Sequence, residues 1–340
     1  MIKQLFTAFI ITMVLGLNSA DAVTFKIATL APNGSTWMKE IQAATDAITK
    51  QTNDRVKFKF YTGGVMGSSN SVLKKMRINQ LQGGAFTAGD LAEIDPDIQI
   101  YTLPFLFRSY DEVDYVRGKM DDVIRKGFEK QGMILLGMSE GGFAYIMSDT
   151  PINSVNELKN KKVWLPEGDK IIETAYAILD IAPVPLSLAD VYTGLQTGLI
   201  DTVGTSAMGA IAFQWYTKVK YVSDIPLMYL TGNLVLDQKA FNQLSENDQA
   251  VVRNVMNDAM KKLDKINRHS EQEARHALEK QGIAFVTISK EERQRAEEVA
   301  KQANDKFAKM GIYTQEMYGL LESHLNTFRS QHNSSANANQ

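Results

Sequence analysis

The chain has 340 residues, and its 37 Lys and Arg residues nearly balance its 39 Asp and Glu residues. This balance excludes a broad basic surface, so we expect no nucleic-acid partner and no attraction to an anionic membrane. The sequence contains no cysteine, which excludes disulfides, a thiolate nucleophile and a lipid-modified N-terminal cysteine.

Residues 1–22 have the pattern of a secretory signal peptide. Lys3 precedes an apolar run that extends from Leu5 to Leu17, and Ala20-Asp21-Ala22 forms a small-x-small cleavage site. The run is shorter than the ~20 apolar residues of a membrane span; an uncleaved anchor helix is the alternative. We predict export, cleavage near Ala22 and a periplasmic protein that diffuses freely. The remaining chain is long enough for two domains.

The first third of the mature chain alternates between strands and helices. Residues 23–30 predict a buried strand, and Ser35 is placed to cap a helix that ends near Thr52. Residues 55–61 alternate with the period of a half-buried strand, and a second helix is expected over residues 69–79. Strands alternating with helices of this length predict a parallel α/β sheet with crossover connections.

The middle of the chain continues the same alternation. Apolar strands are predicted at residues 133–138 and 143–147, with a turn at Glu140-Gly141-Gly142 between them. A further strand at residues 162–165 is followed by Asp169, which is placed to cap a helix. Ser187 is expected to cap the next helix, before a strand at residues 200–203.

The last third is helical in character. Residues 246–281 are rich in helix formers and contain neither proline nor glycine. One helix of that length would be roughly 50 Å long, which exceeds the width of a small domain. We therefore predict a helix that spans both domains; two helices with a break near Asn267 are the alternative. Residues 331–340 are polar and are predicted to be a disordered tail.

Several short segments follow one another in a specific order along the chain. They are Gly64 and Gly67 before a helix ending KKMR, Gln82-Gly83-Gly84, TLPFLF at residues 102–107, Tyr110-Asp111-Glu112, TPINSVNELKNKKV at residues 150–163, Pro183 to Leu186, and DVYTGLQTGLIDTV at residues 190–203. In their order and spacing, over nearly all of the mature chain, they resemble the DctP-type periplasmic receptors of tripartite ATP-independent periplasmic (TRAP) transporters.

The resemblance implies an α/β, two-lobed periplasmic-binding-protein fold with mixed sheets, hinge strands and a long helix that spans both lobes. We predict lobe I from residues 23–141 and 231–267, and lobe II from residues 142–230 and 268–330. The implied function is capture of a small-molecule solute and its delivery to membrane permease subunits driven by an ion gradient. We expect a monomer without cofactor or metal.

Two other functions are alternatives to transport. A receptor that presents its ligand to a membrane sensor kinase would have the same fold. A hydrolase would need a nucleophile and a base in the cleft, and no such pair is apparent, so we predict no enzyme activity.

The sequence departs from the family pattern in the binding pocket. The resemblance implies arginines that hold a substrate carboxylate, but the matching positions are Trp164 and Ala144, and a third contact, often asparagine, falls at Thr205. A guanidinium makes a bidentate clamp that these side chains cannot make. We therefore predict that simple dicarboxylates bind weakly.

Three hypotheses concern what fills the pocket instead. In the first, Trp164 stacks on an apolar or cationic part of the ligand, with Glu140, Glu167 and Asp169 lining the cleft. In the second, an organic acid is held by Lys170, by Arg77, by a bridging metal ion, or by helix N-termini at Ser187 and Ser206. In the third, Trp164 is a core aromatic and Asp169 is only a helix cap.

The remaining candidates are aromatic or titratable. Trp37 and Phe86 are predicted contacts from lobe I, whereas Trp215 is either a pocket or a core residue. His269, Glu273 and His276 share one face of the long helix at a spacing that suits zinc. The charged residues around them favour a solvated face instead.

Overall fold

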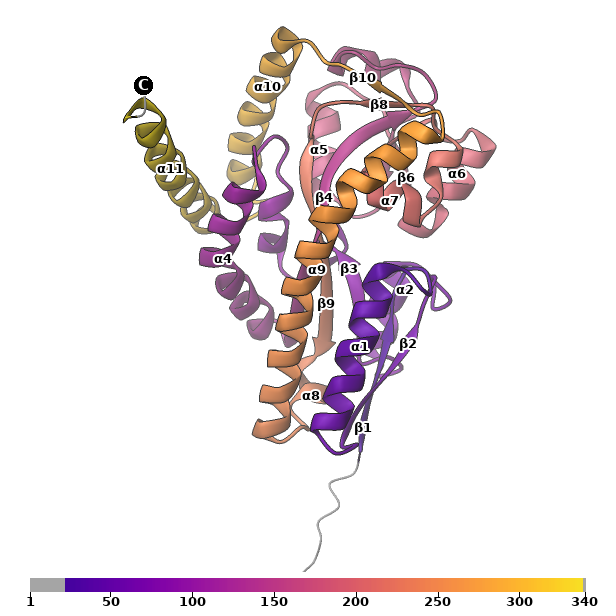
Figure 1. Ribbon diagram of the computed structural model, residues 1–340, viewed down its shortest axis with the longest axis vertical. Coiled ribbons are helices and arrows are strands. Elements are labelled where there is room, and N and C mark those ends of the chain that lie inside the picture. Colours follow the sequence, from indigo (N-terminus) through magenta and orange to yellow (C-terminus); the bar gives the residue numbers. More distant parts are fainter. Residues whose placement is uncertain (1–21, 339–340) are drawn as a thin grey trace, which may run out of the picture.

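The computed structural model describes residues 22–338, so nearly all of the predicted signal peptide lies outside the described residues. Among the described residues, no helix is both long and apolar enough to cross a membrane. The chain forms a mixed α/β fold of two lobes (Figure 1).

The first three strands of lobe I are parallel, as the sequence predicts, and strand β9 (Met228–Asp237) joins their sheet antiparallel to β3. Strand β1 pairs in parallel with β2 on one side and with β3 on the other. Helix α1 begins after Ser35, whose hydroxyl accepts a hydrogen bond from the Met38 amide at 3.3 Å. The bounds are β1 Val23–Ala28, α1 Thr36–Gln51, β2 Val56–Tyr61, α2 Ser69–Arg77, β3 Gly83–Thr87, α3 Ala88–Leu91, η1 Pro96–Thr102 and α4 Tyr110–Lys130.

Two long strands connect the lobes. Strand β4 (Met133–Ser148) pairs antiparallel with β9 (Met228–Asp237) along most of its length, and its last residues then pair with β7 and β8. The predicted turn at Glu140-Gly141-Gly142 is wrong, because β4 runs through it as a single strand. Gly142 adopts a left-handed φ of 82°, and the register of the β4–β9 pair shifts between Glu140 and Gly142. The three residues form a bulge that bends the strand and does not reverse it.

Lobe II carries the other end of the sheet and a small separate sheet. Strand order in the main sheet is β10-β8-β4-β9-β3-β1-β2, with β7 also on β4, while β5 pairs with β6. The bounds are η2 Val155–Asn160, β5 Trp164–Pro166, α5 Lys170–Ile178, β6 Val184–Leu186, η3 Leu188–Asp190, α6 Val191–Thr197, β7 Thr202–Thr205, α7 Ala207–Ala212, η4 Trp215–Thr217, β8 Tyr221–Ser223, α8 Gln238–Phe241 and β10 Ala284–Val286.

The predicted spanning helix is confirmed. Helix α9 (Glu246–Lys280) is one uninterrupted helix of 35 residues, without a break at Asn267, and Figure 1 shows it running along both lobes. Met256 and Met260 bury its first half in the core of lobe I, whereas Ala274 and Leu278 bury its second half in the core of lobe II. One apolar face of α9 therefore packs against the cores of both lobes.

The C-terminal helices differ from the predicted boundaries. Helix α10 (Lys290–Lys309) packs on α5, but α11 (Gln315–Ala338) packs on α4 of lobe I, where Leu321 and Leu325 join the lobe I core. The tail predicted to be disordered from residue 331 is helical as far as Ala338. The ion pair between Arg329 Nε and Glu112 Oε1, at 2.7 Å, holds this helix on α4, and adding residues to an existing helix is favourable.

Candidate functional site

A cavity of about 850 Å³ lies where the two lobes face each other. It is formed by the loop after β1, by β3 and α3, by the connecting strands β4 and β9, and by β5, α5 and α7 of lobe II. Every residue predicted for the site lines this cavity, namely Trp37, Phe86, Glu140, Ala144, Trp164, Glu167, Asp169, Thr205, Ser206 and Trp215. Lining a cavity does not by itself assign a role, and their individual surroundings differ.

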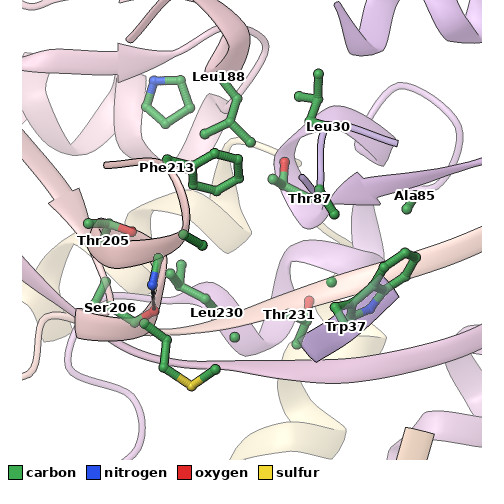
Figure 2. Close-up of a pocket in the computed structure, with 18 of the residues that line it drawn as sticks. Leu30, Trp37, Ala85, Thr87, Leu188, Thr205, Ser206, Phe213, Leu230 and Thr231 are labelled. Carbon is green, nitrogen blue, oxygen red and sulfur yellow. Dashed lines mark hydrogen bonds between the residues drawn. The ribbon is translucent and has the colours of Figure 1, made fainter. Parts of the chain in front are cut away.

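Apolar side chains from both lobes face the centre of the cavity. Figure 2 shows Leu30 and Trp37 of lobe I, Leu188 and Phe213 of lobe II, and Leu230 of β9 around one open space. Each of these side chains is only partly buried, so part of each is available to a ligand. Aromatic and aliphatic walls with a few polar groups are typical of small-molecule sites.

No lysine, arginine or histidine is among the described residues that line this cavity. Lys170, one of the cations considered for an organic acid, instead bonds to Glu173 at 2.7 Å on the surface. Arg77, the other, lies at the end of α2 and away from the lining. Neither side chain can take the place of the missing arginine clamp.

The N-terminus of α7 is occupied by a carboxylate of the protein itself. Ser206 caps this helix through Gly209, and the next two amides, of Ala207 and Met208, donate to the Glu271 carboxylate at 3.1 and 3.4 Å. Glu271 comes from α9. The amides after Ser206, one of the two suggested anion sites, are therefore satisfied, and a second anion there would be repelled. Ser187, the other, precedes a 3-10 helix of three residues and donates its hydroxyl to Asp190.

Trp164 and Trp215 are core residues that also border the cavity. Their relative exposures are 6% and 1%, and their rings meet edge to face with centroids 5.3 Å apart. The Trp164 indole nitrogen donates to the Leu186 carbonyl at 2.9 Å across the β5–β6 sheet. Phe86 and Ala144 are also buried. The fixed position of the Trp164 ring favours the hypothesis of a core aromatic at that position.

The Glu140 carboxylate, in the wall of the cavity, is bonded to other side chains of the protein. Its side chain is fully buried, and it pairs with Arg268 of α9 at 2.9 Å and accepts from the Tyr229 hydroxyl at 3.4 Å. Burial raises the pKa of Glu140 to about 7, against the opposing effect of Arg268. This residue therefore lies at the bulge in β4 as part of a structural network, with no carboxylate oxygen left free of protein partners.

The same network contains an arginine that the sequence reasoning did not single out. Arg117 of α4 is 9% exposed and donates to Asp264 of α9 at 2.9 Å and to the Met138 carbonyl at 2.9 Å. Asp264 in turn accepts from the Glu140 amide at 2.7 Å. Helix α9 is thereby bonded to α4 and to the bulge of β4. The local signal was the i, i+4 spacing of Arg117 and Asp121 on α4, which form an ion pair at 3.1 Å.

Asp169 and Asp90 meet at the edge of the cavity where the lobes touch. Asp169 caps α5 through the Ile172 amide at 3.0 Å and accepts from Gln99 of lobe I at 3.1 Å. A Cβ atom at Gly89 would lie 3.0 Å from its Oδ2 atom, so the lobes are in contact here. Burial, together with the nearby Asp90 carboxylate, raises the pKa of Asp169 to about 6.

The three residues on α9 whose spacing suits zinc do not come together as a metal site. His269 and Glu273 form an exposed pair at 3.6 Å, and His276 pairs with Glu279 at 3.2 Å. Within residues 22–338, no group of three or more His, Cys, Asp or Glu side chains is placed to hold a metal ion.

The chain is similar to a known protein family over most of its length. The family model for the bacterial extracellular solute-binding proteins of family 7, DctP, matches residues 27–310. The ectoine-binding periplasmic protein TeaA of Halomonas elongata is 25% identical over 80% of this chain and 81% of its own length. The C4-dicarboxylate-binding periplasmic protein DctP of Rhodobacter capsulatus is 21% identical over 76% of this chain and 78% of its own length.

A solved structure has the same fold. The TRAP periplasmic solute-binding protein of Desulfovibrio salexigens, solved with bound orotic acid, gives a TM-score of 0.83 at 18% identity. The match covers 90% of this chain and 99% of that protein.

Proposed function

The chain belongs to the DctP family of extracellular solute-binding proteins, the periplasmic receptors of TRAP transporters, and from this premise we propose what it binds and where it delivers it. It captures a small organic molecule in the cavity between its lobes and delivers it to a TRAP-type permease driven by an ion gradient. The observation that carries this proposal is the cavity of about 850 Å³ lined by both lobes and by the strands that connect them.

Binding at such a place has a physical consequence. A ligand that contacts both lobes stabilises the closed arrangement by its differential affinity for the closed form. Strands β4 and β9 and helix α9 are the connections about which the lobes would move. We retain the predicted lobes, residues 23–141 with 231–267 and residues 142–230 with the chain from 268, except that α11 moves with lobe I.

The pocket is atypical for the family. The positions where the resemblance implies arginine are Trp164 and Ala144, and no basic side chain from the described residues replaces them in the lining. We therefore propose that the ligand is not a simple dicarboxylate. The described lining also lacks histidine, which leaves no general base of the kind that a hydrolase of the serine type requires.

Reconstitution of uptake tests the proposal. The mature receptor and TRAP-type permease subunits would be combined in proteoliposomes with an imposed ion gradient, and solute accumulation would be measured with and without receptor. We expect accumulation that needs both the receptor and the gradient. Solute binding without accumulation, together with a response of a membrane sensor kinase, would instead support the sensory alternative. Solute turnover by the receptor alone would refute the proposal.

A further inference from the structure

Three carboxylates stand together at the cavity edge where the lobes meet, and we name them the carboxylate cluster: Asp90, Glu167 and Asp169. Asp90 belongs to α3 of lobe I, whereas Glu167 and Asp169 follow β5 in lobe II. Figure 2 shows Thr87, which caps the helix of Asp90, across the open space from Leu188 and Phe213. The cluster therefore borders the apolar part of the same cavity.

The three carboxylates repel one another. The pKa of Asp90 is raised chiefly by burial and further by the Glu167 charge, and that of Asp169 is raised by burial and by Asp90. Asp90 and Asp169 each accept hydrogen bonds from nearby amides, but no ion pair compensates either charge among the described residues. The exposed Glu167 carboxylate has neither a hydrogen bond nor an ion pair there.

No neighbouring side chain neutralises the charge of the carboxylate cluster in the described structure. Lys170 follows Asp169 in the chain but bonds to Glu173. Gln99 is fully buried and donates to Asp169, yet the oxygen of the same amide has no hydrogen-bond donor in the described structure. A buried acceptor without a donor is costly. Bringing the lobes together thus gathers negative charge at the edge of the cavity, which a cationic group of the ligand would offset.

We propose that the solute of this receptor is an organic cation, with its ammonium group among Asp90, Glu167 and Asp169 and its apolar body against Trp37 and Phe213. This inference rests on the proposed receptor function and names the ligand class of the same site. Charge attraction to the cluster favours such a ligand over an anion, and the aromatic rings bury its apolar body. A bare metal ion fits less well, because no group of acidic or histidine side chains in residues 22–338 is placed to coordinate one.

A matched series of probes tests the charge of the ligand. Binding of 2-phenylethylammonium, 2-phenylethanol and 3-phenylpropanoate would be measured by calorimetry near neutral pH, with calcium chloride alone as a further arm. We expect the ammonium compound to bind at least about tenfold more tightly than the neutral alcohol, a difference of about 1.4 kcal/mol. We expect no binding of the carboxylate. Preference for the carboxylate, stabilisation by calcium alone, or no binding of the ammonium compound would overturn the inference.

Variants locate the charge that is recognised. Glu167→Gln removes an exposed carboxylate without hydrogen-bond partners, so the fold should be kept, and affinity for the ammonium probe should fall about fivefold. Affinity for the alcohol should not change. Glu298→Gln, on the exposed face of α10 and outside the cavity, is the matched control and should have no effect. Equal affinities of wild type and Glu167→Gln would contradict the placement. Receptor-dependent uptake of an anionic solute would overturn the cation inference while leaving the receptor function intact.

Discussion

Replacement of Trp164 by alanine separates a core role from a ligand-binding role at this position. The wild-type side chain is 6% exposed, and an aromatic residue buries about 150–250 Å². Losing about 150 Å² of apolar burial at ~25 cal/mol per Å² costs about 4 kcal/mol. This agrees with the roughly 3–5 kcal/mol that buried tryptophan and phenylalanine truncations cost in general. The Leu186 carbonyl would also lose one of its two donors and would keep the Glu167 amide.

We therefore expect Trp164→Ala to lower the free energy of unfolding by about 4 kcal/mol, a large part of the ~5–15 kcal/mol of a typical domain. The assay is urea-induced unfolding followed by far-ultraviolet circular dichroism, because removing an indole changes the fluorescence signal itself. Phe213→Ala is the matched control. This ring is only partly buried and faces the cavity, so its loss should reduce ligand affinity with a smaller cost in stability.

A different outcome is expected if the Trp164 indole acts mainly on the ligand and contributes little to the core. A Trp164→Ala protein that loses less than about 1 kcal/mol of stability but all ligand affinity would show that the indole acts mainly on the ligand. Trp164→Phe refines the result, since it keeps an aromatic ring in the core and loses only the hydrogen bond to Leu186. We expect it to retain most of the stability that the alanine variant loses.

Three further predictions concern charged groups. Glu271→Ala leaves the Ala207 and Met208 amides without an acceptor, and we expect a loss of about 1–2 kcal/mol in urea unfolding together with measurable binding of 3-phenylpropanoate, which the wild type should not bind. Arg117→Met removes the ion pairs to Asp264 and Asp121 and leaves the partly buried Asp264 carboxylate with the Glu140 amide as its remaining partner, so unfolding should become easier by about 3–5 kcal/mol; a loss below about 1 kcal/mol would contradict the proposed network. Because the pKa of Asp169 is raised to about 6, its contribution to stability is largest below about pH 4 and is lost as the pH rises to 6. Asp169→Asn should remove that slope from the pH profile of unfolding, and an unchanged slope would refute the assignment.

Local patterns were sufficient for the helices and for the strands of lobe I. Ser35 caps α1 as its hydroxyl and position predict, and the absence of proline and glycine from residues 246–281 gives one continuous helix. The bulge in β4 was misread as a turn, because Gly-Gly favours either and the choice depends on the distant partner strand β9. The docking of α11 on α4 likewise depends on contacts between segments far apart in the sequence.

Site residues that stand next to family motifs could be predicted from the sequence. Contacts between residues far apart in the sequence could not. Trp164, Ala144 and Thr205 were found through neighbouring motifs, and all three line the cavity. Asp264, the partner of Arg117 on α9, lies 147 positions away from it, and Glu140 and Arg268 are 128 positions apart. No spacing rule joins such residues. Arg268 therefore had the appearance of a solvated charge, although it pairs with a fully buried carboxylate.

The proposed change of ligand class would require little change of fold. Trp164 and Ala144 are buried by the neighbouring core, so apolar side chains at these positions add packing where a guanidinium would need an anion beside it. Glu271 already satisfies the helix amides that could have received a ligand carboxylate. With no positive lining residue described and with Asp90, Glu167 and Asp169 at the edge, an anion entering the cavity would meet carboxylates without a compensating cation. On our proposal, the same lobes and connecting strands therefore hold a cavity whose charge disfavours the acids that an arginine clamp would bind.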